Sequence, residues 1–82
     1  MTKGCICVKE GDSKVYLYQH GDAYDLPKIL KRALLRGRER WDDLPYLTRI
    51  IFCEMVKDDL MGTTGFGISD FEIEGIFVTV NV

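Results

Sequence analysis

The side chains best suited to chemistry lie in one short stretch, residues 16–27, which reads YLYQHGDAYDLP. A histidine titrates near neutral pH, so His20 with Asp22 close by in the chain could act as a general acid–base pair. The stretch also holds three of the four tyrosines, Tyr16, Tyr18 and Tyr24. Tyrosines of this kind often anchor a bound partner, but they also pack against helices in a core. No G-x-S-x-G nucleophile motif accompanies the pair, so we expect a binding role and assign no catalytic residue.

Two further motifs are weaker. Residues 62–67 read GTTGFG, which resembles a phosphate-binding loop in composition. A phosphate loop precedes a helix and usually carries a lysine, whereas this one follows an expected helix and leads into a strand. The hydroxyls of Thr63 and Thr64 remain candidate contacts.

The chain has three cysteines, Cys5, Cys7 and Cys53. Cys5 and Cys7 form one close pair, but no second pair follows at the spacing of metal ligands. We therefore expect buried thiols and no metal site.

Basic residues are concentrated in one segment. Six of the eleven lysines and arginines fall within residues 28–40, among them Lys28, Arg32 and Arg36, and Trp41 follows directly. Residues 1–40 have a net charge of +4 and residues 41–82 a net charge of −6. The basic segment could meet phosphates or an acidic protein surface; it could also be the solvated side of an amphipathic helix.

Composition sets the broad class. With 82 residues and 46% hydrophobic side chains, we expect one compact domain over residues 1–82. The net charge of −2 argues against non-specific nucleic-acid binding. The chain has no apolar run long enough for a membrane span or a secretory signal. Three cysteines without framework spacing indicate a reduced protein, and we expect it in the cytoplasm with no membrane partner.

The elements that would position these residues begin with a β-hairpin. Residues 4–10 and 14–20 are rich in β-formers, and Gly11, Asp12 and Ser13 separate them as a three-residue turn. That turn predicts Val8 opposite Tyr16. One face would then carry Ile6, Val8, Tyr16, Tyr18 and His20, and the other Cys5, Cys7, Val15 and Leu17.

Two helices and two strands follow. Each helix opens with Asp-Leu-Pro, at 25–27 and again at 43–45, and continues with apolar residues at helical spacing. Strands are expected over 63–69 and 71–82, with a bulge at Gly75 where the apolar pattern shifts. We therefore predict an α+β fold of order β-β-α-α-β-β, in which an antiparallel sheet of about four strands carries both helices on one face.

The order of landmarks resembles that of a group of small uncharacterised bacterial and phage or prophage proteins. In that group a His-x-Asp-x-Tyr segment follows the first hairpin, and a Thr-Thr-Gly loop precedes the last strand. The corresponding residues here span nearly the whole chain: His20, Asp22, Tyr24, Thr63, Thr64 and Gly65. The group commonly has tryptophan and glycine within the first motif, where this chain has Gly21 and Ala23. The resemblance implies a phage setting and brings no established activity.

These observations lead us to expect a small non-enzymatic protein without a cofactor, which binds a host or phage protein stoichiometrically. A phage accessory protein or host-defence antagonist would fit, as a monomer or a homodimer. One alternative is a nucleotide-sequestering protein, its pocket lined by the tyrosines, His20 and the 63–67 loop, with Arg32 or Arg36 meeting phosphate. The second alternative is a small enzyme that uses His20 and Asp22.

Overall fold

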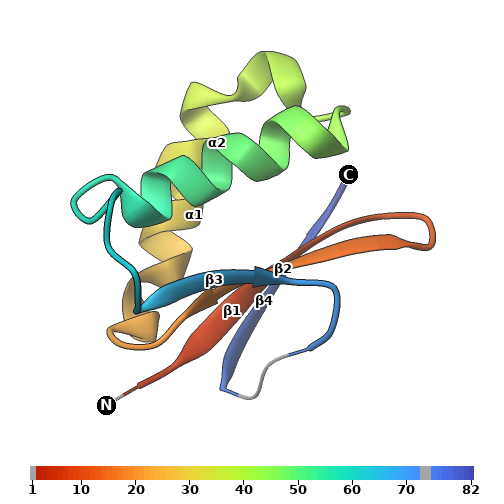
Figure 1. Ribbon diagram of the computed structural model, residues 1–82. Helices are drawn as coiled ribbons and strands as arrows, with labels where there is room; N and C mark the ends of the chain where they lie inside the picture. The colour runs from red at the N-terminus through yellow and green to blue at the C-terminus, as the bar shows by residue number, and fades with distance from the viewer. Residues whose placement is uncertain (1, 73–74) are drawn as a thin grey trace.

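The computed structural model describes residues 2–72 and 75–82, with only the backbone described for Ile76. Four strands form one sheet, and two α-helices lie together on one side of it (Figure 1). In chain order the elements are β1 (Gly4–Glu10), β2 (Ser13–Gln19), η1 (Ala23–Asp25), α1 (Leu26–Arg36), η2 (Arg38–Arg40), α2 (Leu44–Val56), β3 (Phe66–Ser69) and β4 (Ile76–Asn81), where η1 and η2 are short 3-10 helices. The predicted α+β fold with about four strands and two helices on one face is confirmed.

The sheet is mixed, so the prediction of a fully antiparallel sheet is wrong. The strand order is β3-β2-β1-β4, with β1 antiparallel to β2 and parallel to β4. The strands β3 and β4 therefore lie at opposite edges and do not form a hairpin. Strand β4 begins at Ile76, later than expected, and the predicted strand residues Ile73 and Glu74 lie outside the described residues.

The β1–β2 turn is one residue shorter than predicted. Glu10 pairs with Ser13, so Gly11 and Asp12 alone make the turn, and Gly11 has the positive φ of 59° that a type II′ hairpin requires at its first position. Val8 consequently pairs with Val15 instead of Tyr16. A slip of one residue moves every side chain of a strand to the other face, so the predicted division of the hairpin between faces is also wrong.

With the correct register, the face toward the helices is mainly apolar, and buried Gln19 at the end of β2 is its polar exception. Ile6, Val8 and Leu17 are fully buried there beneath the two helices, and Val78 and Val80 of β4 pack against them. We call the opposite side, over which neither α-helix lies, the open face. It carries Cys5, Cys7 and Tyr16, which form a small second cluster. The predicted burial of the cysteines is confirmed for Cys5 and Cys7, whereas Cys53 of α2 is only partly buried.

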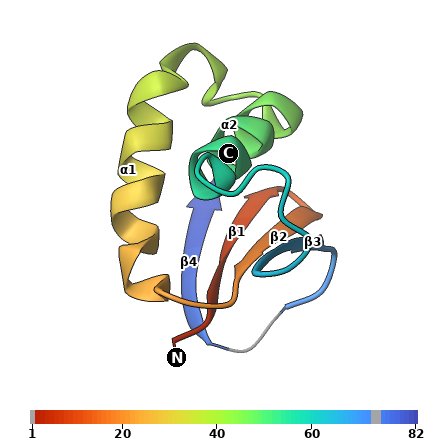
Figure 2. The same ribbon diagram turned by 60° about the vertical axis from the view of Figure 1, so that its left-hand side comes forward.

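Both helices begin where the sequence predicts. In α1 the apolar stripe is buried, with Leu26 and Ala33 fully covered, and Gly37 follows the helix as its C-cap. Figure 2 shows α1 on the β4 side of the molecule and α2 over the middle strands. No helix in the described ranges is long and apolar enough to cross a membrane.

Candidate functional site

Tyr18 and His20 form a polar pair at the end of β2. The Tyr18 hydroxyl lies 2.6 Å from His20 Nδ1, and the histidine is exposed. The His20 backbone N–H donates to the Gly65 carbonyl at 2.8 Å, which brings the loop containing Thr63 and Thr64 next to it. These four predicted site residues therefore share one end of the sheet. The pair offers hydrogen-bonding groups to a ligand, and His20 Nδ1 is already hydrogen-bonded to Tyr18.

Asp22 and Tyr24 follow on the next turn. Buried Gln19 donates to the carbonyls of Gly21 and Asp22, at 2.7 and 3.2 Å, and so holds this turn to the sheet. Asp22 has φ 56°, a left-handed conformation that aspartate tolerates better than most residues. Tyr24 is 75% exposed. The ring hydrogen bond of His20 goes to Tyr18 and not to Asp22, so the described geometry gives no support to the acid–base pair considered as an alternative.

Tyr16 differs from the other tyrosines because it is buried. It pairs with Cys7 across the ladder, and its ring centroid lies 6.0 Å from that of Phe77. Burial raises the pKa of Tyr16, and the nearby Cys7 thiol contributes to the same effect. Tyr16 holds the open face together and leaves little surface for a ligand.

The basic candidates lie on the other side of the sheet. Lys28, Arg32 and Arg36 belong to α1, in the helical layer, whereas Tyr16 and Tyr18 face the open side. The structure therefore separates the parts of the nucleotide pocket that the sequence suggested.

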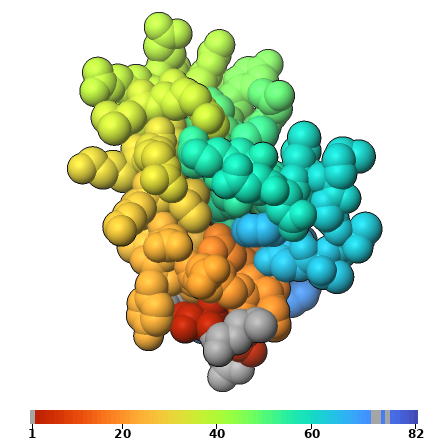
Figure 3. Space-filling model, turned by 90° about the vertical axis from the view of Figure 1, so that its left-hand side faces the viewer, coloured from red at the N-terminus to blue at the C-terminus, as the bar shows by residue number. Residues whose placement is uncertain are grey.

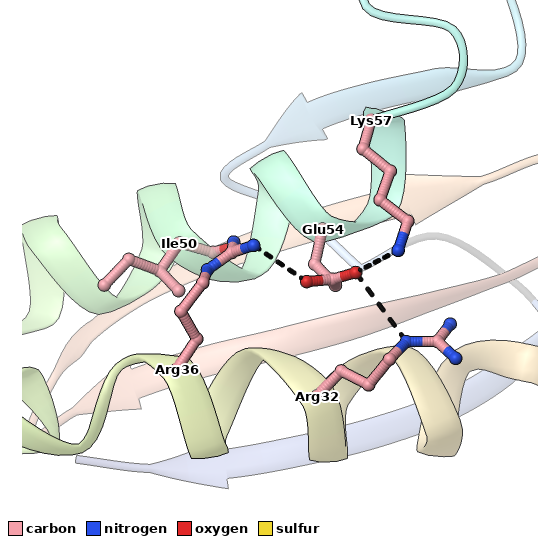
Figure 4. A network of polar contacts seen from close by, with 5 residues as sticks. All are labelled: Arg32, Arg36, Ile50, Glu54 and Lys57. Atoms are coloured by element: carbon pink, nitrogen blue, oxygen red, sulfur yellow. Dashed lines mark hydrogen bonds and ion pairs between the residues drawn. The ribbon is translucent and has the colours of Figure 1, made fainter.

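A buried carboxylate organises this basic side. Glu54 of α2 is only 6% exposed, and three cations surround it (Figure 4). Arg36 Nη1 donates to its Oε1 at 2.9 Å, while Lys57 Nζ and Arg32 Nε lie 2.7 and 3.7 Å from its Oε2. Arg36 also donates to the Ile50 carbonyl at 3.1 Å. The network joins α1 to α2 and fixes cationic side chains that remain about half exposed.

The electrostatics of Glu54 follow from these contacts. The hydrogen bond from Lys57 and the charges of Lys57, Arg36 and Arg32 lower its pKa, outweighing burial, which acts in the opposite direction. Glu54 is thus a carboxylate that neutralises one of three neighbouring cations. The two remaining positive charges lie on the surface formed by α1 and the adjoining α2. Figure 3 shows these two helices side by side.

The connection between the helices continues this surface. Arg36, Arg38 and Arg40 line a cleft of about 470 Å³ together with Ile50. Arg40 lies over the ring of Tyr46, with its guanidinium carbon 5.0 Å from the centroid, a cation–π arrangement.

Trp41, next to Arg40, is half exposed. Its indole N–H donates to the Leu34 carbonyl at 2.9 Å, which fixes the ring. Tryptophan, tyrosine and arginine are the residues most enriched at binding hot spots. The sequence pointed to the basic segment and to Trp41, but it did not reveal Glu54 or Tyr46.

Glu54 nevertheless has a detectable sequence signal. Leu47, Ile51, Glu54 and Met55 follow the spacing i, i+4, i+7 and i+8, which marks one buried helical stripe. A carboxylate within such a stripe predicts a buried partner. No three His, Cys, Asp or Glu side chains come together as a metal site within the described ranges.

No protein-family model matches the chain, and no curated protein or solved structure matches it significantly. The resemblance to small phage and bacterial proteins therefore stays a prediction.

Proposed function

We propose that the protein is a non-catalytic binding domain whose α1 surface holds an acidic surface of a partner protein. The carrying observation is the charge of α1, which has four basic residues and no acidic residue over Leu26–Arg36. Its apolar stripe is buried, so the basic side chains necessarily face outward. Lys57, the C-cap residue of α2, adds a further cation beside it.

Preorganisation supports a binding role for this surface. Side chains of arginine and lysine lose conformational entropy when a partner fixes them. Here Glu54 already holds Arg32, Arg36 and Lys57 in place, so part of that loss occurs on folding. Three cations gathered around one buried carboxylate also leave more positive charge on the surface than a simple ion pair between two helices would.

Acidic residues at both ends of this surface favour a protein partner over a nucleic acid. Asp25 and Asp58 lie at one end, lining a groove of about 370 Å³ with Lys28 and Arg32. Glu39 lies at the other end, in the cleft with the arginines. A nucleic-acid backbone running along α1 would meet this negative charge, whereas an acidic patch of limited size would fit between the two ends.

The experiment is a comparative capture from a lysate of the source cells at low and physiological salt. The test variant is Lys28→Glu/Lys31→Glu/Arg38→Glu, which reverses three exposed charges outside the Glu54 network. The control, Lys3→Glu/Lys9→Glu/Lys14→Glu, changes the net charge equally at the hairpin.

We expect the wild type and the control to recover one protein at a fixed ratio, and the test variant to lose it. Equal recovery by all three baits, or recovery of nucleic acid alone, would contradict the proposal. A phage setting, antagonism of a host protein and a cytoplasmic location remain predictions.

A further inference from the structure

The free edge of β4 is unusually unprotected. Within the described part of the chain, β4 lies at the end of the sheet with β1 as its single neighbour. The Val82 N–H points toward β1, where it donates to the Lys9 carbonyl at 2.7 Å. Because backbone direction alternates along a strand, the N–H and C=O groups of Phe77, Thr79 and Asn81 point outward.

The composition of β4 makes this edge suitable for another strand. Its sequence, IFVTVN, contains no charge and no proline, which are common devices that keep edges from pairing. The opposite edge, β3, has only four residues and contains Gly67, so it is the poorer template.

An apolar cavity lies at the C-terminal end of this edge. Its volume is about 220 Å³, and its lining comes from α1, α2, β4 and the helix connection: Leu34, Trp41, Leu47, Val80 and Asn81. Pockets for drug-sized ligands usually span roughly 300–1,000 Å³, so this one is better matched to a single apolar side chain.

We propose that an extended segment of the acidic partner adds to the free edge of β4 as a fifth strand and places one apolar side chain in this cavity. The inference rests on the proposed function, because the basic helix α1 lies on the β4 side of the molecule (Figure 2). Lys31 precedes the cavity residue Leu34 by one helical turn, so acidic residues beside the anchor would be attracted. Main-chain hydrogen bonds supply affinity in this mode, and the pocket supplies specificity.

A second copy of this chain is a less favourable occupant. Antiparallel pairing of two β4 edges around a two-fold axis would bring two α1 helices toward each other on the same side of the sheet. Each α1 carries basic and no acidic residues, so the two helices would repel. An acidic segment meets no such penalty.

The test uses short random peptides displayed as a library and selected on the immobilised full chain. Peptides that are enriched are then measured against Thr79→Pro, which removes one outward N–H, and against Thr79→Val, which keeps it. Trp41→Ala opens the cavity, and Lys31→Glu tests the charge. In the wild type, amide hydrogen exchange is followed at Phe77, Thr79 and Asn81.

We expect the enriched peptides to combine an apolar residue with acidic neighbours. Thr79→Pro and Trp41→Ala should each weaken binding about tenfold or more, while Thr79→Val binds as the wild type does. Exchange at the three outward amides should slow on binding. This last measurement needs no variant, so it stands even if Thr79→Pro unfolds.

Other results would overturn the inference in distinguishable ways. Peptides that lose affinity with Lys31→Glu but bind Thr79→Pro and Thr79→Val equally would disprove strand addition and leave the proposed function standing. Peptides sensitive to Thr79→Pro but indifferent to Lys31→Glu would instead disprove the acidic partner. An absence of enriched peptides, or a wild-type dimer that Thr79→Pro dissociates, would disprove a partner segment at this edge.

Discussion

Arg36 of α1 connects to α2 through two different groups at once. Its Nη1 donates to Glu54 Oε1 at 2.9 Å, and its Nη2 donates to the Ile50 carbonyl at 3.1 Å. One guanidinium thereby ties a buried carboxylate and the backbone one turn before it to the neighbouring helix. Together with the apolar packing between the helices, this contact holds α1 beside α2 and positions Arg36 within the basic surface.

Replacing Glu54 with glutamine should lower the free energy of unfolding by about 1–2 kcal/mol. The amide loses the charge-assisted bonds, but the three cations are half exposed and can be hydrated instead. Urea unfolding measures the change. Glu39→Gln, an exposed carboxylate, is the control and should change stability little; an equal loss in both variants would argue against a special role for Glu54.

The same residue predicts acid sensitivity. The folded-state pKa of Glu54 lies below its ordinary value of 4.5, so its stabilising effect is complete above that pH and disappears as pH falls through the folded pKa. Stability measured from neutral pH downward should therefore fall below about pH 4.5. The fall should be smaller in Glu54→Gln. Identical acid profiles for the wild type and Glu54→Gln would show that other carboxylates account for it.

The two Asp-Leu-Pro segments should respond differently to mutation. The Asp43 side chain accepts a hydrogen bond from the Tyr46 N–H at 3.2 Å, whereas Asp25 makes no side-chain cap hydrogen bond. Asp43→Ala should cost about 1 kcal/mol and Asp25→Ala less than about 0.5 kcal/mol. Thermal unfolding of the two variants checks this, and the reverse order would contradict the capping geometry.

Gly75 and Gly65 make a second matched pair. Both have positive φ, 131° and 94°, but a Cβ at Gly75 would collide with the Lys3 carbonyl, while none of the described atoms lies within 4 Å at Gly65. Gly75→Ala should therefore destabilise by at least about 2 kcal/mol, and Gly65→Ala by about 1 kcal/mol from backbone strain alone. Chemical denaturation distinguishes them. Equal costs would mean that strain alone matters at both.

The sheet register is tested by truncating two residues that pair across β2 and β3. Leu17 is fully buried beneath the helices, and its partner Ile68 is 62% exposed. Leu17→Ala should cost about 3 kcal/mol, and Ile68→Ala less than about 1 kcal/mol. Comparable losses in unfolding free energy would be inconsistent with the β2 register.

The helices could be predicted because their signals are local. Asp-Leu-Pro opens each one, and the buried residues Leu26, Ile29 and Ala33 follow at helical spacing. Such patterns depend on neighbours within two turns of the chain. Glu54 was missed because its three cationic partners come partly from α1, and a carboxylate is normally assigned to a solvated side.

The sheet was predicted less well because its order depends on distant pairing. Ser13 resembles a turn residue but pairs with Glu10, and that single residue decided which hairpin face met the helices. Neither strand contains a local sequence signal that would predict the parallel pairing of β4 with β1. The candidate site was affected differently: Tyr16 shares a face with Tyr18 as predicted, but it is buried by contacts with Cys7 and the distant Phe77.

Pairing between the first and last strands has a consequence for folding order. Strand β2 reaches β1 through a two-residue turn, but Ile6 and its β4 partner Val78 are separated by most of the chain. Closing so large a loop is entropically slow, so the β1–β2 hairpin can form early while β4 joins late. During synthesis, one edge of β1 stays unpaired until β4 has emerged from the ribosome. In that interval the nascent chain exposes an apolar strand edge that chaperones can recognise.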